Sequence, residues 1–164
     1  MPLIAETPFQ VVAAALDAAA SEAGALAMQW FRAGARTTAR TDYKHGGSPV
    51  TEADLAVDRF LRERLTALFP DAGWLSEETA DSPARLEAAS VFIVDPIDGT
   101  RGFAEGDARW SVSAALVRAG RPVAGRLSQP LANRHDYGHA ACRCTGLDHG
   151  SGRSADGVYP TPRA

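Results

Sequence analysis

The chain has 164 residues, of which 45% are hydrophobic and 23% are charged, and its formal net charge at pH 7 is −3. This composition is typical of a soluble globular protein with one core of ordinary size. The slightly acidic balance and the lack of a basic cluster argue against nucleic acid as a partner.

The N-terminal segment and the cysteines indicate a compartment. Residues 1–6 carry no positive charge, and the apolar run that follows is interrupted by Asp17 and Glu22. Neither a signal peptide nor a membrane span is therefore predicted. The two cysteines, Cys142 and Cys144, are one residue apart, which favours a reducing compartment over a disulfide framework. We expect a cytoplasmic protein with no membrane partner.

The first half of the chain predicts two helices. A helix starts at residues 7–8, a threonine and a proline, and apolar residues at helical spacing carry it to Gly34. Residues 37–49 are polar and contain glycines, which predicts a loop or a loose hairpin. A second helix starts near Thr51, which forms a capping box with Asp54 in place of the usual glutamate.

The second half predicts strands. Residues 74–76 form a short strand that ends at two acids, and residues 91–94 are a continuous apolar run typical of a buried strand. Residues 110–117 and 123–127 predict a hairpin. Together these elements predict an α/β fold, an α+β layered sandwich with helices packed on a mostly antiparallel sheet.

The sequence changes character after Pro130. Residues 131–164 contain few large aliphatic side chains, so burial there cannot offset the ordering entropy, and we expect a disordered tail. The histidines and cysteines of this tail follow no zinc spacing, so a zinc site is not favoured. They are His135, His139, Cys142, Cys144 and His149.

The segment at residues 95–100 carries the strongest chemical signal. The apolar strand delivers Asp95 to its end, and Pro96 keeps Asp95 extended. Asp98 follows, so two carboxylates flank the Ile97 carbonyl. Hard oxygen ligands of this kind suit Mg²⁺, which takes a few carboxylates and keeps several waters.

Three more acids stand apart from this segment in the sequence. Glu77 and Glu78 end the short strand, and Asp54 lies near the start of the second helix. If these acids converge in space, their mutual repulsion calls for divalent cations. Spacing alone favours a plainer alternative, in which Asp98 belongs to a turn and the glutamates to a solvated loop.

Three separated motifs resemble the inositol monophosphatase family. They are the Ser-Glu-Glu of residues 76–78, the Asp-Pro-Ile-Asp-Gly-Thr of residues 95–100, and the upstream residues 47–54. The resemblance covers roughly residues 7–130, and it is specific because three motifs coincide in order and spacing. It implies the N-terminal domain of the sugar-phosphatase fold, with residues 1–130 as a metal-binding phosphatase domain.

The resemblance also implies a metal centre of two or three Mg²⁺ ions. By this resemblance Glu77 and Asp95 bridge metals, the Ile97 carbonyl completes the first site, and Asp98 holds the second metal. These four are the expected metal ligands. In such a centre one metal makes a nucleophile from a bound water, and the other stabilises the leaving oxygen.

The catalytic and substrate-binding residues follow from the same resemblance. Asp54 and Thr100 are expected to activate water, and together with Glu77 they form the catalytic set. Asp98, Gly99 and Thr100 are expected to bind the substrate, with the backbone N–H groups of Gly99 and Thr100 facing its phosphate.

Neighbouring residues leave alternatives open. Lys44 faces the phosphate or, as the favoured interpretation, is a solvated surface lysine. Glu78 supports the ligands from behind or is solvated. Phe103 and Trp110 are expected in the core, with Phe103 close enough to shape the site. Arg101 is either a surface residue or a substrate contact.

The family pattern breaks in the last part of the chain. A second family domain, whose Trp-Asp segment supplies a further metal ligand, has no counterpart here. Arg126 stands in a strand where an apolar residue fits better, and the tail from Asn133 is unlike the family. We therefore expect a truncated chain, with a reading-frame change near residues 126–135 as one origin.

The expected function is Mg²⁺-dependent hydrolysis of a small phosphorylated metabolite, with an inositol phosphate as the default substrate. The alternative is a 3′(2′),5′-bisphosphate nucleotidase, since residues 75–78 and 100–103 also resemble that subfamily; histidinol phosphate is a further substrate to test. An alternative of another class is a truncated, non-catalytic remnant that binds metal. The resemblance implies a homodimer, and truncation leaves other modes of association open.

Overall fold

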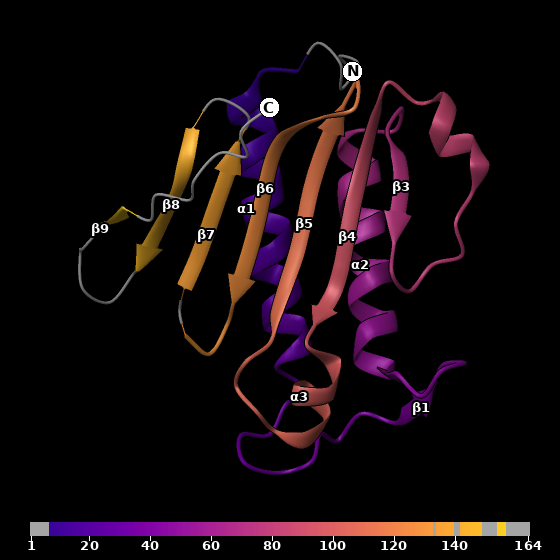
Figure 1. Ribbon diagram of the computed structural model, residues 1–164, viewed down its shortest axis with the longest axis vertical. Coiled ribbons are helices and arrows are strands. Elements are labelled where there is room, and N and C mark those ends of the chain that lie inside the picture. Colours follow the sequence, from indigo (N-terminus) through magenta and orange to yellow (C-terminus); the bar gives the residue numbers. More distant parts are fainter. Residues whose placement is uncertain (1–6, 133, 140–141, 149–153, 157–164) are drawn as a thin grey trace.

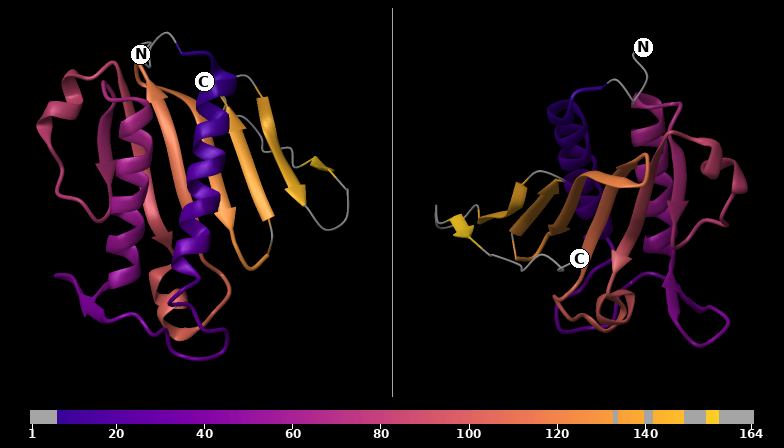
Figure 2. Two further views of the ribbon diagram at one scale, coloured as in Figure 1. Left: turned by 180° about the vertical axis from the view of Figure 1, so that it is seen from behind. Right: turned by 45° about the horizontal axis from the view of Figure 1, so that its top comes forward.

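Two long helices lie side by side on one face of a large sheet (Figure 1). The computed structural model describes residues 7–132, 134–139, 142–148 and 154–156. Helix α1 spans Phe9–Ala27 and helix α2 spans Glu52–Leu68. Seen from behind, both helices stand in front of the same face of the strands (Figure 2). The helices and the sheet thus form two layers with the core between them.

The central strands of the sheet confirm the predicted architecture. They are β3 (Gly73–Ser76), β4 (Ser90–Asp98), β5 (Ser111–Arg118) and β6 (Arg121–Gln129). Strands β3 and β4 are parallel, and each later pair is antiparallel. The mostly antiparallel sheet under packed helices is the layered α/β fold that the sequence predicts.

Three strands continue the sheet beyond β6. They are β7 (Arg134–His139), β8 (Cys142–Asp148) and β9 (Ser154–Asp156), each antiparallel to its predecessor. A disordered tail is predicted from residue 131, whereas these described segments are paired. The hydrogen bonds between strands are made by backbone N–H and C=O groups and not by side chains. A polar sequence can therefore continue a sheet.

Two predictions concern positions at the ends of the chain that lie outside the described residues. His149, one of the histidines for which a zinc site is not favoured, belongs there. Residues 1–6, on which the prediction about a signal peptide depends, lie outside as well. Among the helices that the structure describes, none is both long and apolar enough to cross a membrane.

An aromatic cluster forms the core at the end of the sheet where β4 finishes. The rings of Phe103 and Trp110 meet edge to face with centroids 5.0 Å apart, and Phe31 lies 5.6 Å from Phe103. All three side chains are buried. Burying each such ring contributes about 2–3 kcal/mol to the stability of the fold. The cluster therefore stabilises this end of the sheet. The expectation that Phe103 and Trp110 are core residues is confirmed.

Helix α1 is shorter than its apolar pattern predicts. It ends at Ala27, although the pattern continues to Gly34. The Trp30 carbonyl accepts hydrogen bonds from the Thr38 N–H at 3.0 Å and the Thr37 hydroxyl at 2.9 Å. Phe31 is buried all the same, in the aromatic cluster. Tertiary contacts therefore account for the apolar residues after Ala27.

The predicted capping box at the start of α2 is confirmed. The Thr51 hydroxyl accepts from the Asp54 N–H, and the Thr51 N–H donates to the Asp54 carboxylate at 2.8 Å. Just before it, strands β1 (Thr41–Tyr43) and β2 (Pro49–Thr51) form a short antiparallel hairpin. This hairpin is the loose one expected in residues 37–49, and it brings Lys44 to its tip.

Arg126 is accommodated in β6 by an acid from α1. Its side chain is only 2% exposed and forms an ion pair with Asp17. The sequence favours an apolar residue at this buried position. An arginine fits because its charge finds a carboxylate on the helix packed against the strand.

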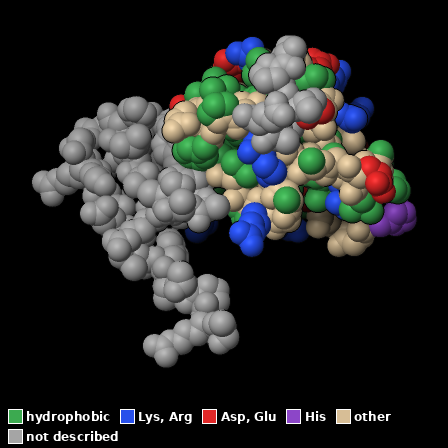
Figure 3. Space-filling model, turned by 90° about the horizontal axis from the view of Figure 1, so that it is seen from above, with side chains coloured by type: hydrophobic (Ala, Val, Ile, Leu, Met, Phe, Trp, Pro, Cys, Tyr) green, Lys and Arg blue, Asp and Glu red, His purple; other side chains and the backbone are tan. Residues whose placement is uncertain are grey.

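The upper end of the molecule, where β5 finishes, has a mixed surface. On the described part of this face, Lys and Arg side chains are interspersed with acidic, hydrophobic and other polar groups (Figure 3). A protein that follows a nucleic-acid backbone needs a continuous basic surface. The described residues on this face do not form one.

Candidate active site

The ends of two parallel strands bring the predicted acids together. Ser76 of β3 pairs with Val94 of β4, and the Glu77 N–H donates to the Val94 carbonyl at 3.3 Å. Glu77, which directly follows β3, and Asp95, which lies within β4, are therefore neighbours in space although they are separated in the sequence. The register between β4 and β5 shifts between Asp95 and Asp98, where Pro96 removes a ladder donor.

A left-handed glycine turns the chain after these acids. Gly99 has φ of +92° and begins the short helix α3 (Thr100–Glu105). A Cβ at this position would lie 2.9 Å from the Arg109 carbonyl oxygen, so a larger residue is excluded on both grounds. The turn predicted after Asp98 is present, and Gly99 and Thr100 stand at the start of α3 as expected.

The acids at this edge repel one another. The pKa of Asp95 is raised to about 7, first by burial and then by the negative charges of Glu77 and Asp98, with smaller contributions from a hydrogen bond to Glu77 and from Asp54. If Asp98 belonged to an isolated turn and the glutamates to a solvated loop, their charges would not raise the pKa of Asp95. Tertiary structure thus brings these acids close enough for their negative charges to repel one another.

A buried hydrogen bond joins the second helix to α3. The Thr100 Oγ1 lies 2.9 Å from the Asp54 Oδ1 and 2.9 Å from the Ile97 carbonyl oxygen. A hydroxyl has one proton, so it donates to one of these acceptors at a time. Asp54 is 1% exposed, and the Thr51 hydroxyl donates to its other oxygen at 2.6 Å. Burial raises the pKa of Asp54, although its hydrogen bonds with Thr51 and Thr100 oppose the shift.

Lys44 has a role that the sequence does not reveal. Its Nζ lies 2.8 Å from the Glu78 Oε1 and 3.2 Å from the Glu77 Oε1. The favoured prediction of a solvated lysine is therefore wrong, and so is a solvated Glu78, whose side chain is 4% exposed. Burial alone would lower the pKa of Lys44, but its hydrogen bonds to the two glutamates and their charges raise it.

The donor chemistry at this edge fits Mg²⁺. Every candidate ligand is an oxygen: the carboxylates of Glu77, Asp95 and Asp98 and the Ile97 carbonyl. The carboxylates repel one another, and a divalent cation bound between them would neutralise this repulsion. Among the described residues, no group of three or more His, Cys, Asp or Glu side chains is arranged to hold a metal ion. Mg²⁺ can bind through few protein ligands, since it keeps several of its own waters.

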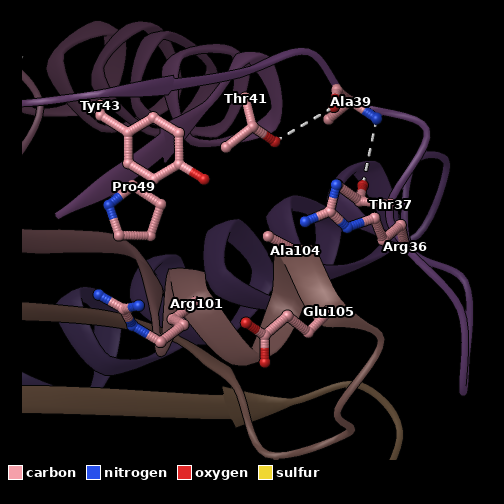
Figure 4. A pocket seen from close by; sticks show the side chains of 9 residues that line it. All are labelled: Arg36, Thr37, Ala39, Thr41, Tyr43, Pro49, Arg101, Ala104 and Glu105. Atoms are coloured by element: carbon pink, nitrogen blue, oxygen red, sulfur yellow. Dashed lines mark hydrogen bonds between the residues drawn. The ribbon is translucent and has the colours of Figure 1, made fainter. Parts of the chain in front are cut away.

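A pocket of about 280 Å³ is lined in part by α3, the helix that Thr100 begins (Figure 4). It is bounded by the loop after α1, by the β1–β2 hairpin and by α3. Arg101, predicted as a surface residue or a substrate contact, lines it directly after Thr100. No motif points to Arg36 and Tyr43, which line it too, because their segments meet α3 only in the folded chain.

Comparison with known proteins identifies a family. The sequence model of the Inositol monophosphatase family matches residues 9–148. The match continues beyond residue 130, where the resemblance read from the motifs ends. The match thus extends past Asn133, the point from which the sequence predicts a tail unlike the family.

Individual relatives agree with the family match. The 3′(2′),5′-bisphosphate nucleotidase CysQ of Aggregatibacter actinomycetemcomitans is 42% identical over 90 residues, covering 54% of this chain and 34% of the relative. The histidinol-phosphatase of Chlorobaculum parvum is 34% identical over 111 residues, covering 68% of this chain and 41% of the relative. These matches span less than half of each curated relative.

A solved structure shows the same fold. The extragenic suppressor protein suhB from Bartonella henselae superimposes with a TM-score of 0.74 at 25% sequence identity. The superposition covers 84% of this chain and 52% of that chain. The described layers of helices and sheet therefore correspond to about half of a known fold.

Proposed function

We propose that this chain, which belongs to the inositol monophosphatase family, carries the metal-binding and water-activating residues of a Mg²⁺-dependent phosphomonoesterase whose substrate is a 3′(2′),5′-bisphosphate nucleotide. One observation carries the proposal. The buried Asp54 accepts from Thr100 directly beside the coupled acids at the end of β4. A proton acceptor close to oxygen ligands that suit Mg²⁺ is what a metal-dependent hydrolysis needs, and this supports the proposal.

The substrate assignment rests on the relatives. The bisphosphate nucleotidase is 42% identical over 90 residues, against 34% over 111 residues for the histidinol-phosphatase. The inositol phosphate expected by default has weaker support than this nucleotide, and it stays a comparison substrate.

The metal ligands in this proposal are those that the resemblance implies. Glu77, Asp95, Asp98 and the Ile97 carbonyl would hold the ions. Bound Mg²⁺ supplies charge neutralisation and lowers the pKa of a coordinated water. Lys44 holds Glu77 and Glu78 together, so it keeps Glu77 near the ligand position.

Thr100 and Asp54 form the path for the proton of the attacking water. The Thr100 oxygen accepts a proton from water while its own hydroxyl proton passes to the Asp54 Oδ1. The 2.9 Å contact between the two side chains supports this transfer. Because Asp54 is buried, its carboxylate accepts a proton more readily than a solvated one. Asp98, Gly99 and Thr100 orient the substrate phosphate.

Phosphate release is the test of this function. We would measure Mg²⁺-dependent release from adenosine 3′,5′-bisphosphate, inositol 1-phosphate and histidinol phosphate. Asp95→Asn should lower the rate by about 100-fold or more. Asp81→Asn changes an exposed acid that pairs with Arg85 and is not among the proposed ligands. As the control, it should stay within about twofold.

The two outcomes separate the function classes. A higher rate on the bisphosphate, lost in Asp95→Asn, supports the proposal. Mg²⁺ binding without phosphate release from any substrate would replace it with the non-catalytic, metal-binding alternative. Equal rates in Asp95→Asn and the wild type would contradict the assignment of the site.

A further inference from the structure

The charged side chains that line the pocket at α3 are mostly of one sign. Arg36 and Arg101 lie on different sides of it, and Glu105 is the acid of its lining (Figure 4). Two guanidinium groups against one carboxylate leave the pocket with a net positive charge. An anion is therefore the ligand that its charge favours.

The two arginines are available for a ligand. Within the described residues, neither the Arg36 nor the Arg101 side chain forms a hydrogen bond or an ion pair. Other arginines on this surface are engaged, as Arg40 is with Asp42 at 3.3 Å and Arg109 with Asp107. Guanidinium groups match phosphate oxygens in a bidentate fork.

Backbone hydrogen bonds hold Arg36 across from α3. The Thr37 N–H donates to the Ala104 carbonyl at 3.0 Å, and the Gly34 N–H donates to the Gly106 carbonyl at 2.9 Å. These bonds fix the segments on either side of Arg36 to the end of the helix that carries Arg101. The spacing of the two arginines is thus built into the fold, although the side chains themselves are exposed.

The pocket and the catalytic residues share two segments. Arg101 follows Thr100 in α3, and Tyr43 precedes Lys44 in the hairpin. Because both segments are continuous with the candidate site, one substrate with its reacting phosphate at Thr100 is the ligand considered for the pocket. Tyr43 is 68% exposed and pairs with Pro49 across the hairpin. An exposed aromatic ring next to cations suits a nucleoside phosphate, because bases stack on such rings.

We propose that this pocket binds the non-reacting phosphate of a nucleoside bisphosphate between Arg36 and Arg101, with the base against Tyr43. This inference rests on the proposed function, because it names the part of the substrate that is not hydrolysed. The cavity of 280 Å³ lies near the lower end of small-molecule sites, about 300–1,000 Å³. It has room for a phosphate and part of a nucleoside.

Binding of adenosine 5′-monophosphate tests the pocket without turnover. This nucleotide carries the phosphate that remains after hydrolysis at the 3′ position. Calorimetry on the full chain without metal should give an affinity at least tenfold higher for it than for adenosine. Arg36→Gln and Arg101→Gln should each weaken adenosine 5′-monophosphate binding about tenfold and leave adenosine binding within about twofold.

Two further variants test the sign of the effect. Glu105→Gln removes the negative charge of the lining and should strengthen nucleotide binding severalfold. Arg121→Gln removes a guanidinium from the β5–β6 turn, at the far end of the sheet from Asp98, and should leave binding unchanged. An equal loss in Arg121→Gln and Arg101→Gln would reduce the effect to net charge and overturn the proposal.

The outcomes distinguish this proposal from the proposed function. Equal affinity of the wild-type chain for adenosine and its 5′-monophosphate would overturn the pocket assignment, even with phosphatase activity intact. Binding of adenosine 5′-monophosphate that each arginine variant weakens about tenfold would support the pocket, even in a chain that releases no phosphate. Tyr43→Ala should weaken adenosine and adenosine 5′-monophosphate alike, since both carry the base.

Discussion

The Thr100 hydroxyl lies 2.9 Å from the Oδ1 of Asp54, which stands 46 residues earlier in the chain. This contact links the capping box of α2 to the start of α3. A single carboxylate therefore serves the local stability of one helix and the proposed chemistry at the end of β4.

Removing the Thr100 hydroxyl should separate these two roles. Thr100→Ala should lower phosphate release by about 100-fold or more, because the proposed proton path loses its middle member. The capping box remains, so unfolding by urea should show a loss of only about 1 kcal/mol. Thr100→Ser keeps the hydroxyl and should retain most of the activity. Thr66→Ala, which removes an exposed hydroxyl from α2, is the control, and an equal loss there would argue against a specific role.

Lys44 should stabilise the fold through Glu78. Lys44→Met leaves the Glu78 side chain, 4% exposed, without its cation, and we expect a loss of about 1–3 kcal/mol in the free energy of unfolding. Adding Glu78→Gln to this variant should recover part of the loss, since no buried charge then remains. Additive losses in the double-mutant cycle would show that the pair is not coupled.

The exposed pair Arg40–Asp42 on the same hairpin is the matched control. Its side chains are 75% and 64% exposed. Arg40→Met should change stability by no more than about 0.5 kcal/mol, because solvent screens an exposed ion pair.

Mg²⁺ should loosen the contact between Lys44 and Glu77. In the proposed site, the Lys44 ammonium group and Mg²⁺ both bind the carboxylate oxygens of Glu77. A bound metal therefore competes with Lys44. Lys44 is the only lysine of the chain, which makes its acetylation easy to follow by mass spectrometry. The rate should rise when Mg²⁺ is added and return to its starting value with a chelator. The N-terminal amine serves as the internal reference, and a parallel change in both amines would contradict the competition.

Gly106 should be essential for joining the loop after α1 to α3. It has φ of +82°, and a Cβ there would lie 2.3 Å from the Ala35 carbonyl oxygen and 2.5 Å from the Arg32 carbonyl oxygen. Gly106→Ala should destabilise the protein by more than about 2 kcal/mol, from the backbone conformation and the clash together. Thermal unfolding would measure the effect.

Gly120 provides the comparison for this prediction. Its φ is +73°, but a Cβ there would meet nothing within 4 Å. Gly120→Ala should therefore cost only the conformational part, about 1–2 kcal/mol. Equal losses in the two variants would show that the close approach at Gly106 adds nothing.

Much of this fold is predictable from local sequence patterns. The capping box of Thr51 and Asp54, the buried strand before Asp95 and the turn at Gly99 depend on contacts within a few residues. Capping residues, alternating burial and positive-φ glycines report such contacts directly. The acids of the candidate site are visible for the same reason, since each lies in or beside a local element that the pattern predicts.

Tertiary structure decided what depends on partners distant in the sequence. Lys44 reads as a solvated residue until the hairpin brings it to Glu77 and Glu78. After Ala27 the N–H groups of Gln29 and Trp30 bond three residues back, and the returning chain bonds the Trp30 carbonyl, which a helical pattern does not reveal. The polar residues after β6 join the sheet through backbone pairing that side-chain patterns do not encode.

The acids alone identify the type of chemistry at the site, because residue type sets which ligands and protons a side chain can handle. Folding sets how those acids act together. Three features depend on distances between residues that are remote in the sequence: the charge repulsion at Asp95, the bond from Thr100 to Asp54, and the presence of Arg36 and Arg101 in one pocket. Those distances are set only when the helices and the sheet pack together.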